Sequence, residues 1–262
     1  MAGRAPGQRL QMAAAIVVAT AAGIVGAIML IAPSSTARSF AWPLGPRALA
    51  ALVGGFYLVS APLFAYAGRR SALEVRGLAA AVLAFTLPTL AATLIHRDVF
   101  DFDRLFAKTW VVLFIASPVA FAVLLWTGRH AAFSPEEPRV PPVARAVVAV
   151  LGVIFAGLAV GFWTRVSGPV PFAMAPLGAR FLAAWFAFFA TLAIWTALRP
   201  ARSEARLPLL SLVAYGIGGL LAAAAHPADL GPGTGGYLAG LIVAVLIPAL
   251  VLAQLSRLPP RK

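Results

Sequence analysis

The stretch WPLGPRALAA, from Trp42 to Ala51, recurs almost unchanged as APLGARFLAA, from Ala175 to Ala184. At an offset of 133 residues, seven of the twelve positions in 40–51 are identical to those in 173–184. Matches of Leu and Ala are common in so apolar a chain, but the shared pattern Pro-Leu-Gly-x-Arg is not. The recurrence therefore indicates an internal duplication.

Rarer residues repeat at a second, slightly shorter offset. Beyond residue 67 the offset becomes 130, as expected if one linker lost three residues. The pairs in this register are Glu74 with Glu204, Arg76 with Arg206, His96 with His226, and Pro118 with Pro248. Because the chain holds only three His and four Glu, we interpret these matches as further traces of the duplication.

The composition is that of a membrane protein. Of the 262 residues, 61% are hydrophobic and 11% are charged, whereas a soluble globular protein carries about 25% charged residues. A helix needs about 20 apolar residues to cross the hydrocarbon core, and backbone groups in lipid must be satisfied within the segment. The candidate spans are 10–31, 47–67, 77–95, 108–126, 144–163, 180–198, 208–225 and 237–256. We therefore expect an all-α polytopic membrane protein with eight transmembrane helices.

The duplication divides these spans into two parallel four-helix repeats. The first repeat occupies 1–127, a cytoplasmic linker occupies 128–143, and the second repeat occupies 144–262. Since four is an even number, both copies point the same way, and a pseudo-two-fold axis along the membrane normal should relate them. In the linker, Ser134 and Glu137 have capping-box spacing, which predicts a tether with one helical turn.

Charge predicts the orientation and the partners. Lys and Arg number 14 on the side of the termini and 7 on the other side, so both termini should be cytoplasmic. The Arg-rich and Ala-rich composition is typical of a bacterial protein, which places the chain in the bacterial cytoplasmic membrane. The expected partner is the lipid bilayer, with other membrane subunits as a second class. Nucleic acid is not expected, because no basic run of the required length is present.

Four basic residues should share the outer face. Arg47 and Arg180 follow Pro-Leu-Gly at the outer ends of the second and sixth spans, and His96 and His226 end the third and seventh. An arginine fork suits a phosphate or carboxylate, so these residues are candidate contacts for a substrate or a lipid head group. Interfacial anchoring is the interpretation that the residue types favour. A bis-imidazole haem between the two His is a third interpretation.

Other repeated residues are candidates for gating and packing. The third and seventh spans begin with Glu74, Arg76, Glu204 and Arg206, where a carboxylate is favoured by the helix N-terminus and Arg supplies positive charge on the inner side. Structural anchoring explains these residues, and the alternative is an inner gate of repeat-symmetric ion pairs. We expect Pro118 and Pro248 to kink the fourth and eighth spans. Glycine pairs spaced by four, Gly157 with Gly161 and Gly236 with Gly240, predict close helix contacts.

Catalytic chemistry is not indicated. The chain has no Cys, no metal motif and no nucleophile–base pair, so we expect neither an enzyme nor a metal or other cofactor. No Asp, Glu, Lys or His lies at mid-membrane depth, where ionisable groups mark ion coupling. We expect a transporter-like or lipid- or anion-handling protein with a site between the repeats. The alternative is a non-catalytic structural subunit. A central cavity lined by spans from both halves would support the first, and solid packing along the axis would remove it.

Overall fold

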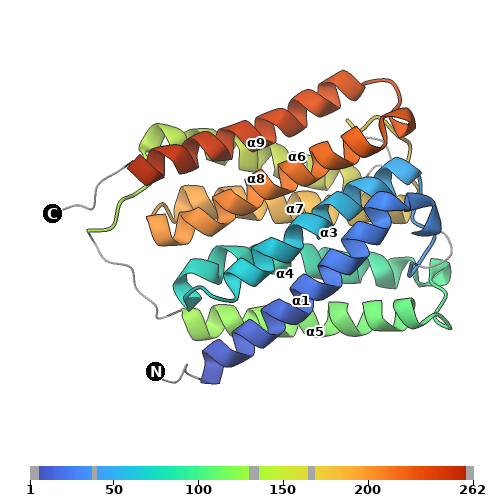
Figure 1. Cartoon of the computed structure of the whole chain (residues 1–262), viewed down its shortest axis with the longest axis horizontal. Coiled ribbons are helices and arrows are strands. Elements are labelled where there is room, and N and C mark those ends of the chain that lie inside the picture. The colour runs from blue at the N-terminus through green and yellow to red at the C-terminus, as the bar shows by residue number, and fades with distance from the viewer. Residues whose placement is uncertain (1–5, 37–39, 130–135, 165–168, 258–262) are drawn as a thin grey trace.

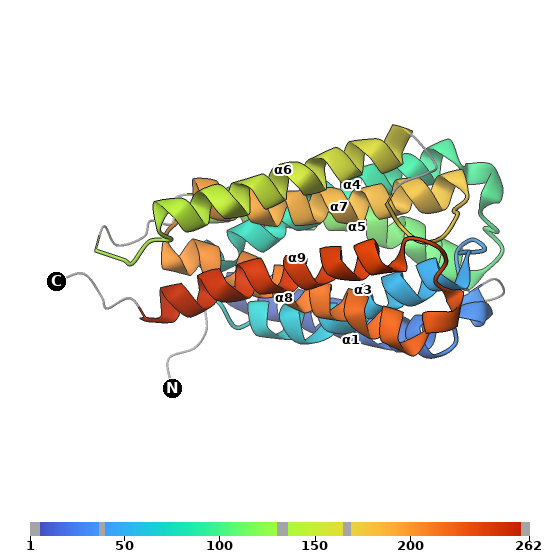
Figure 2. The ribbon, with the colours of Figure 1, turned by 90° about the horizontal axis from the view of Figure 1, so that it is seen from above.

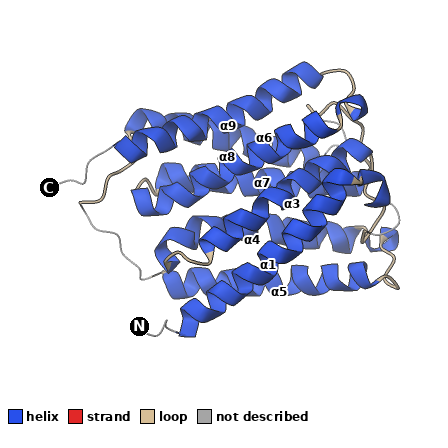
Figure 3. Ribbon diagram, viewed as in Figure 1, coloured by secondary structure: helices blue, strands red, loops and turns tan. Residues whose placement is uncertain are grey.

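The computed structural model describes residues 6–36, 40–129, 136–164 and 169–257, with side chains from Gln11 onward. Its regular structure in these ranges is helical (Figure 3), and eight helices are long and apolar enough to cross a membrane. The eight predicted spans are thereby confirmed as helices. The long helices are α1 (Pro6–Ile31), α3 (Arg47–Ala67), α4 (Ala72–Ile95), α5 (Leu105–Gly128), α6 (Pro142–Thr164), α7 (Pro176–Leu198), α8 (Arg202–Ala225) and α9 (Thr234–Arg257). Three short 3-10 helices are η1 (Pro33–Ser35), η2 (Arg97–Val99) and η3 (Pro227–Asp229).

Two helices begin five or six residues before the predicted spans. Helix α4 starts at Ala72 because Ser71 forms a capping box with Glu74. The Ser71 hydroxyl accepts from the Glu74 N–H, and the Glu74 carboxylate accepts from the Ser71 N–H at 3.0 Å. Helix α8 starts at Arg202, six residues before the predicted span. The first turns of these helices are polar and extend into the membrane interface. An apolar run does not include such turns, so hydropathy alone does not mark the true helix starts.

The two copies of the repeated motif differ in the residue at which their helices begin. In the second copy, Pro176 is the first residue of α7, so Arg180 lies in the second turn. In the first copy, Pro46 replaces the equivalent Ala179, and a residue before proline disfavours the helical conformation. Helix α3 therefore begins only at Arg47, after a cis Gly45–Pro46 peptide. As a result Arg180 lies about one turn deeper along its helix than Arg47 does.

The helices form an inner group of four and an outer group of four. Helices α3, α4, α7 and α8 are the more buried, and α1, α5, α6 and α9 lie at the periphery. In the first half (α1 to α5), α1 packs on α3 and α4 on α5; in the second half (α6 to α9), α6 packs on α7 and α8 on α9. The halves meet through α3 with α8, α4 with α7, and α4 with α8 (Figures 1 and 2).

The two ends of the bundle hold different groups. The start of α1 and the end of α9 lie at one end (Figure 1), which we name the terminal end. The turns between α3 and α4 and between α7 and α8 lie there too. The opposite end holds the starts of α3 and α7 and the ends of α4 and α8. This opposite end therefore carries the four basic residues that the sequence places on one face.

Aromatic rings fill the region where the halves meet. The ring centroids of Phe85 and Trp185 are 4.4 Å apart, and Phe56 lies 5.1 Å from Trp185 and 6.0 Å from Tyr215. The hydroxyls of Tyr215 and Ser60 are hydrogen bonded at 2.8 Å, which joins α8 to α3. The contact between the halves is solidly packed here, which counts against a central substrate path.

Close helix contact occurs at glycines other than the predicted ones. A methyl group built on Gly218 of α8 would lie 2.6 Å from the carbonyl oxygen of Gly55 on α3, so these backbones touch. The predicted positions were wrong: the Cα positions of Gly157, Gly161, Gly236 and Gly240 face open space. Spacing alone does not say which face of a helix meets a neighbour.

Two further predictions concern prolines and the linker. Pro118 and Pro248 lie inside α5 and α9, as their spans predicted, and a kink at either stays a prediction. Ser134 of the expected capping box lies outside the described residues. Its partner Glu137 is not in a helix, and its carboxylate instead accepts from the backbone N–H and hydroxyl of Ser203 in α8.

Candidate functional site

His96 and Arg180 meet at the opposite end of the bundle. His96 is the C-cap of α4, and its Nε2 contacts a terminal guanidinium nitrogen of Arg180 in α7. Because guanidinium has no acceptor, the imidazole accepts this hydrogen bond and is neutral. The Arg180 guanidinium also lies 5.9 Å from the ring centre of Trp163 in α6, within cation–π range. Three elements from both halves therefore position one half-buried cation.

The surroundings favour the neutral form of His96. Burial is the main cause that lowers the pKa of its imidazole, and the Arg180 charge lowers the pKa further. Asp98, in the turn that follows, acts in the other direction. The lowered pKa agrees with an imidazole that accepts a hydrogen bond from Arg180.

Arg47 and His226 lie at the same end without joining this pair. The side chain of Arg47 is exposed. His226 donates from Nε2 to the carbonyl oxygen of Leu30 at 2.6 Å, and its Nδ1 lies 3.7 Å from the Asp229 carboxylate. Of the four residues predicted for this face, the structure brings together only His96 and Arg180.

An apolar depression lies beside Arg180 on the lateral surface of the bundle. This lateral groove has a volume of about 450 Å³ and is shallow. Its lining comes from both halves: Leu87, Pro88 and Ala91 of α4, Ala159, Val160 and Trp163 of α6, and Ala183 and Ala187 of α7. Ala183 follows Arg180 by less than one turn, and Trp163 contacts the Arg180 guanidinium. The Arg180 guanidinium therefore lies next to the part of the groove formed by Trp163, although Arg180 itself does not line the groove.

At the terminal end, an ion pair joins the halves. Arg76 of α4 lies 3.7 Å from the carboxylate of Glu204 in α8, which is only 1% exposed. Neither carboxylate oxygen of Glu204 makes a hydrogen bond to the described residues, and the same holds for the Trp195 indole N–H beside it. Arg76 and Glu204 therefore form an ion pair between the halves, in an environment with few polar partners.

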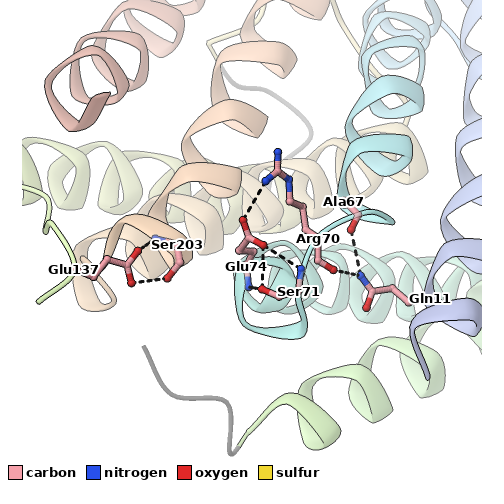
Figure 4. Close-up of polar contacts among 7 residues, drawn as sticks. All are labelled: Gln11, Ala67, Arg70, Ser71, Glu74, Glu137 and Ser203. Carbon is pink, nitrogen blue, oxygen red and sulfur yellow. Dashed lines mark hydrogen bonds and ion pairs between the residues drawn. The ribbon is translucent and has the colours of Figure 1, made fainter. Parts of the chain in front are cut away.

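The equivalent pair does not form. Glu74 bonds to Arg70 at 3.4 Å and to Ser71 (Figure 4), while Arg206 is exposed on α8. Glu74 and Arg206 are thus not brought together. Helix α4 is consequently joined to the second half by Arg76 at one end and by His96 at the other.

Sequence reasoning missed several contacts at the terminal end. Gln11 of α1 donates to the carbonyls of Ala67 and Arg70 at 3.1 and 3.0 Å, and so satisfies the end of α3 (Figure 4). Glu137 lies against Ser203 in the same view. The Ser-Ala-Leu-Glu spacing of 71–74 signals its capping box, but no local pattern predicts the contacts of Gln11 or Glu137.

Within the described ranges, the site offers no cluster for a metal ion. No group of three or more His, Asp or Glu side chains is gathered there. A second apolar cleft of about 190 Å³ lies between α1, α3, α4 and α5, and a smaller one of about 70 Å³ lies mainly within the second half. Neither is lined by His96, Arg180, Arg76 or Glu204, although Tyr215 of the smaller cleft is hydrogen bonded to Ser60 across the halves.

The eight apolar helices mark the chain as an integral, multi-pass membrane protein in a lipid bilayer. Comparison with protein-family models, with curated proteins and with solved structures finds no match. Function is therefore argued from the groove and the cation beside it.

Proposed function

We propose that this protein handles phospholipids, and that the lateral groove between its halves is the binding site. The observation that carries the proposal is an apolar groove, open to the lipid, that lies beside the half-buried cation of Arg180. A phospholipid is complementary to this arrangement, because its apolar acyl chains adjoin an anionic phosphate. The groove would take an acyl chain, and Arg180 would take the phosphate.

The residues around Arg180 support this assignment chemically. Arginine presents five N–H donors in a planar fork that matches phosphate oxygens. His96 accepts from one terminal nitrogen, which holds the fork in place and leaves the other donors for a ligand. The groove volume of about 450 Å³ falls within the range of ligand sites, about 300–1,000 Å³. Trp163 supplies an amphipathic ring at the junction.

We further propose that the halves are two four-helix repeats that point the same way. The packing supports this, because the contacts α3–α8 and α4–α7 exchange when each helix is replaced by its counterpart. The copies of the repeated stretch also approach each other: a methyl group on Gly178 would lie 2.9 Å from Leu49 and 3.7 Å from the Gly45 carbonyl oxygen. Two copies of one segment contact each other in this way when the segment lies beside a two-fold axis.

The repeats differ in a manner that gives one lateral groove. On the side that corresponds to the groove, α1 packs directly on α3, and a methyl group on Gly26 would overlap the backbone of Leu58 and Gly54. His226 binds the Leu30 carbonyl of that same helix. Helix α1 therefore covers the second surface, while α6 leaves the first one open.

We propose that the terminal end faces the cytoplasm of a bacterial cell. The support is the excess of Lys and Arg at that end, with 14 against 7 on the other side, since cytoplasmic loops collect these residues. The lateral groove, which lies beside Arg180, then opens to the outer leaflet. Its ligand would be an outer-leaflet phospholipid.

The test compares lipid retention among variants of the full chain in nanodiscs that contain phosphatidylglycerol, by native mass spectrometry after transfer to detergent. Arg180→Gln removes the cation and should weaken retention of one lipid about tenfold, the value of one hydrogen bond to a charged group. Ala159→Phe fills the groove and should do the same with Arg180 intact. Val153→Phe is the control, because Val153 is 67% exposed on the same helix and does not line the groove.

Each outcome is decisive. Loss in Arg180→Gln and Ala159→Phe, with wild-type retention in Val153→Phe, supports the proposal. If Ala159→Phe retains lipid as the control does, the groove does not hold an acyl chain and the proposal is wrong. Free glycerol phosphate that displaces the lipid would identify a soluble anion as the ligand instead.

The solid aromatic packing between the halves favours a second candidate, a non-catalytic subunit of a membrane assembly. Mild extraction from the native membrane distinguishes the two: a structural subunit migrates with other proteins at fixed stoichiometry, and a lipid-handling protein migrates alone. The haem interpretation has less support, since His96 and His226 bind separate protein groups. An absorption spectrum without a Soret band would end it.

A further inference from the structure

A pocket at the terminal end combines two arginines with an apolar floor. It lies between the start of α8 and the end of α9 and has a volume of about 280 Å³. We name it the α8–α9 pocket; Arg202, Arg206 and Ser256 form its polar part, and Leu210, Leu252, Ala253 and Leu255 form its apolar part. It shares no residue with the lateral groove.

The two guanidinium groups share one face of α8. Arg202 and Arg206 are four residues apart, so they are neighbours on the helix surface and repel each other. Among the described residues, no ion pair joins either of them to a carboxylate. An anion between them would remove this repulsion.

The nearby carboxylates are engaged elsewhere. Glu204 lies between the two arginines in sequence but is buried against Arg76 on the other side of the helix. Glu137 accepts from Ser203, and Glu74 pairs with Arg70. None of these three carboxylates therefore balances the positive charge of Arg202 and Arg206.

We propose that the α8–α9 pocket binds the phosphate group of an anionic phospholipid. The arginine pair would hold the phosphate, and the acyl chains would follow Leu210, Leu252 and Leu255 along the helices. A soluble phosphate would use the arginines but leave the apolar floor exposed. The apolar floor directly below the charges therefore favours the lipid as the ligand.

Comparison of the halves assigns the pocket to the second half alone. At the offset of 130 residues, Arg202 corresponds to Ala72 and Ser256 to Trp126. The counterpart of Arg206 is Arg76, which is committed to Glu204. This site and the lateral groove therefore lie at opposite ends of the bundle and are independent: the inference does not rest on the proposed function.

The experiment places the full chain in nanodiscs of phosphatidylcholine alone or mixed with phosphatidylglycerol and counts bound phosphatidylglycerol by native mass spectrometry. The double variant Arg202→Gln, Arg206→Gln should lose about 25-fold in apparent affinity, because each arginine at an anionic membrane surface contributes about fivefold. Arg69→Gln is the control, because it removes the charge of one exposed arginine at the same end of the bundle, outside the α8–α9 pocket. All variants are compared in an Arg180→Gln background, so that a lipid in the lateral groove does not contribute to the count.

Equal retention in the double variant and in Arg69→Gln would overturn the proposal. So would displacement of the lipid by inorganic phosphate, because the ligand would then be a free anion. Leu252→Trp provides a second route: it fills the apolar floor with both arginines intact, and it should also weaken phosphatidylglycerol retention. Unchanged retention in Leu252→Trp would contradict an acyl chain in the pocket.

Discussion

The ion pair of Arg76 and Glu204 is the most costly polar contact between the halves. Desolvation of two charges is repaid only when hydrogen bonds satisfy them, and both Glu204 oxygens lack such bonds to the described residues. Each partner therefore depends on the other. Loss of one charge should destabilise the protein more than loss of both charges does.

Arg76→Met should destabilise the protein by about 3 kcal/mol, the order seen when a buried charge loses its partner. Adding Glu204→Met should recover most of this loss, because an apolar pair needs no compensation. Unfolding in detergent measures both. Arg70→Met, which breaks the half-exposed pair with Glu74, is the control and should cost under about 1 kcal/mol. A double variant less stable than Arg76→Met would contradict this account.

His96 should make stability depend on pH. Its pKa is lowered in the folded protein, through burial and through Arg180, while the unfolded chain titrates near the usual value of about 6.5. Below that value the unfolded state binds more protons, so stability is full above about pH 6.5 and falls as pH drops toward the folded pKa. The unfolding temperature of His96→Gln should lose this dependence. His226→Gln, at the matching helix end, should keep it; an identical pH profile for wild type and His96→Gln would refute the assignment.

At this scale the sequence predicted residue types better than partners. It singled out Arg76, Glu204, His96 and Arg180 because they repeat in the two halves, and because His and Glu are rare in the chain. It did not predict that Arg76 binds Glu204 while Arg206 stays exposed, since partner choice depends on which helices of the two halves face each other. That information is not local to either motif.

Among the elements, the helices are well predicted and their contact surfaces are not. Apolar runs of about 20 residues are sufficient to specify spanning helices, and all eight are present. Contact surfaces depend on which side of an apolar helix meets another, and a helix that is apolar on all sides carries no such signal. For this reason the glycine spacing pointed to Gly157 and Gly161 rather than to Gly55 and Gly218.

Alanine substitutions at two of the glycines should change the stability of the bundle in opposite directions. Gly218→Ala places a methyl group 2.6 Å from the Gly55 carbonyl oxygen, and such overpacking should destabilise the bundle by about 1–3 kcal/mol. Gly157→Ala meets no neighbour within 4 Å and should be neutral or stabilising by up to about 1 kcal/mol through helix propensity. Unfolding midpoints in detergent compare the two. Equal effects would contradict the α3–α8 contact.

For the whole molecule, the duplication predicted that four basic residues share one end, and the structure places them there. It did not predict the single lateral groove, because the groove arises where the halves differ. Pro46 delays α3, so Arg47 lies near the surface while Arg180 lies beside the groove. Helix α1 covers the position that α6 leaves open. A perfect repeat would have had two such sites or none.

The proposed site in the lateral groove depends on the shared direction of the two halves, because residues of both halves line it. The chain has no cysteine, so single cysteines can be introduced without background. Arg97 and Leu230 follow α4 and α8, while Arg69 and Arg257 lie at the terminal end. Each is replaced by cysteine in a separate variant: Arg97→Cys, Leu230→Cys, Arg69→Cys and Arg257→Cys.

The most direct measurement is labelling of these four variants in sealed vesicles by a thiol reagent that does not cross the membrane. We predict that the Arg97→Cys and Leu230→Cys variants react from one side, and that the Arg69→Cys and Arg257→Cys variants react only from the other. Reaction of Arg97→Cys and Leu230→Cys from opposite sides would contradict the parallel arrangement and remove the basis for the lateral groove between the halves.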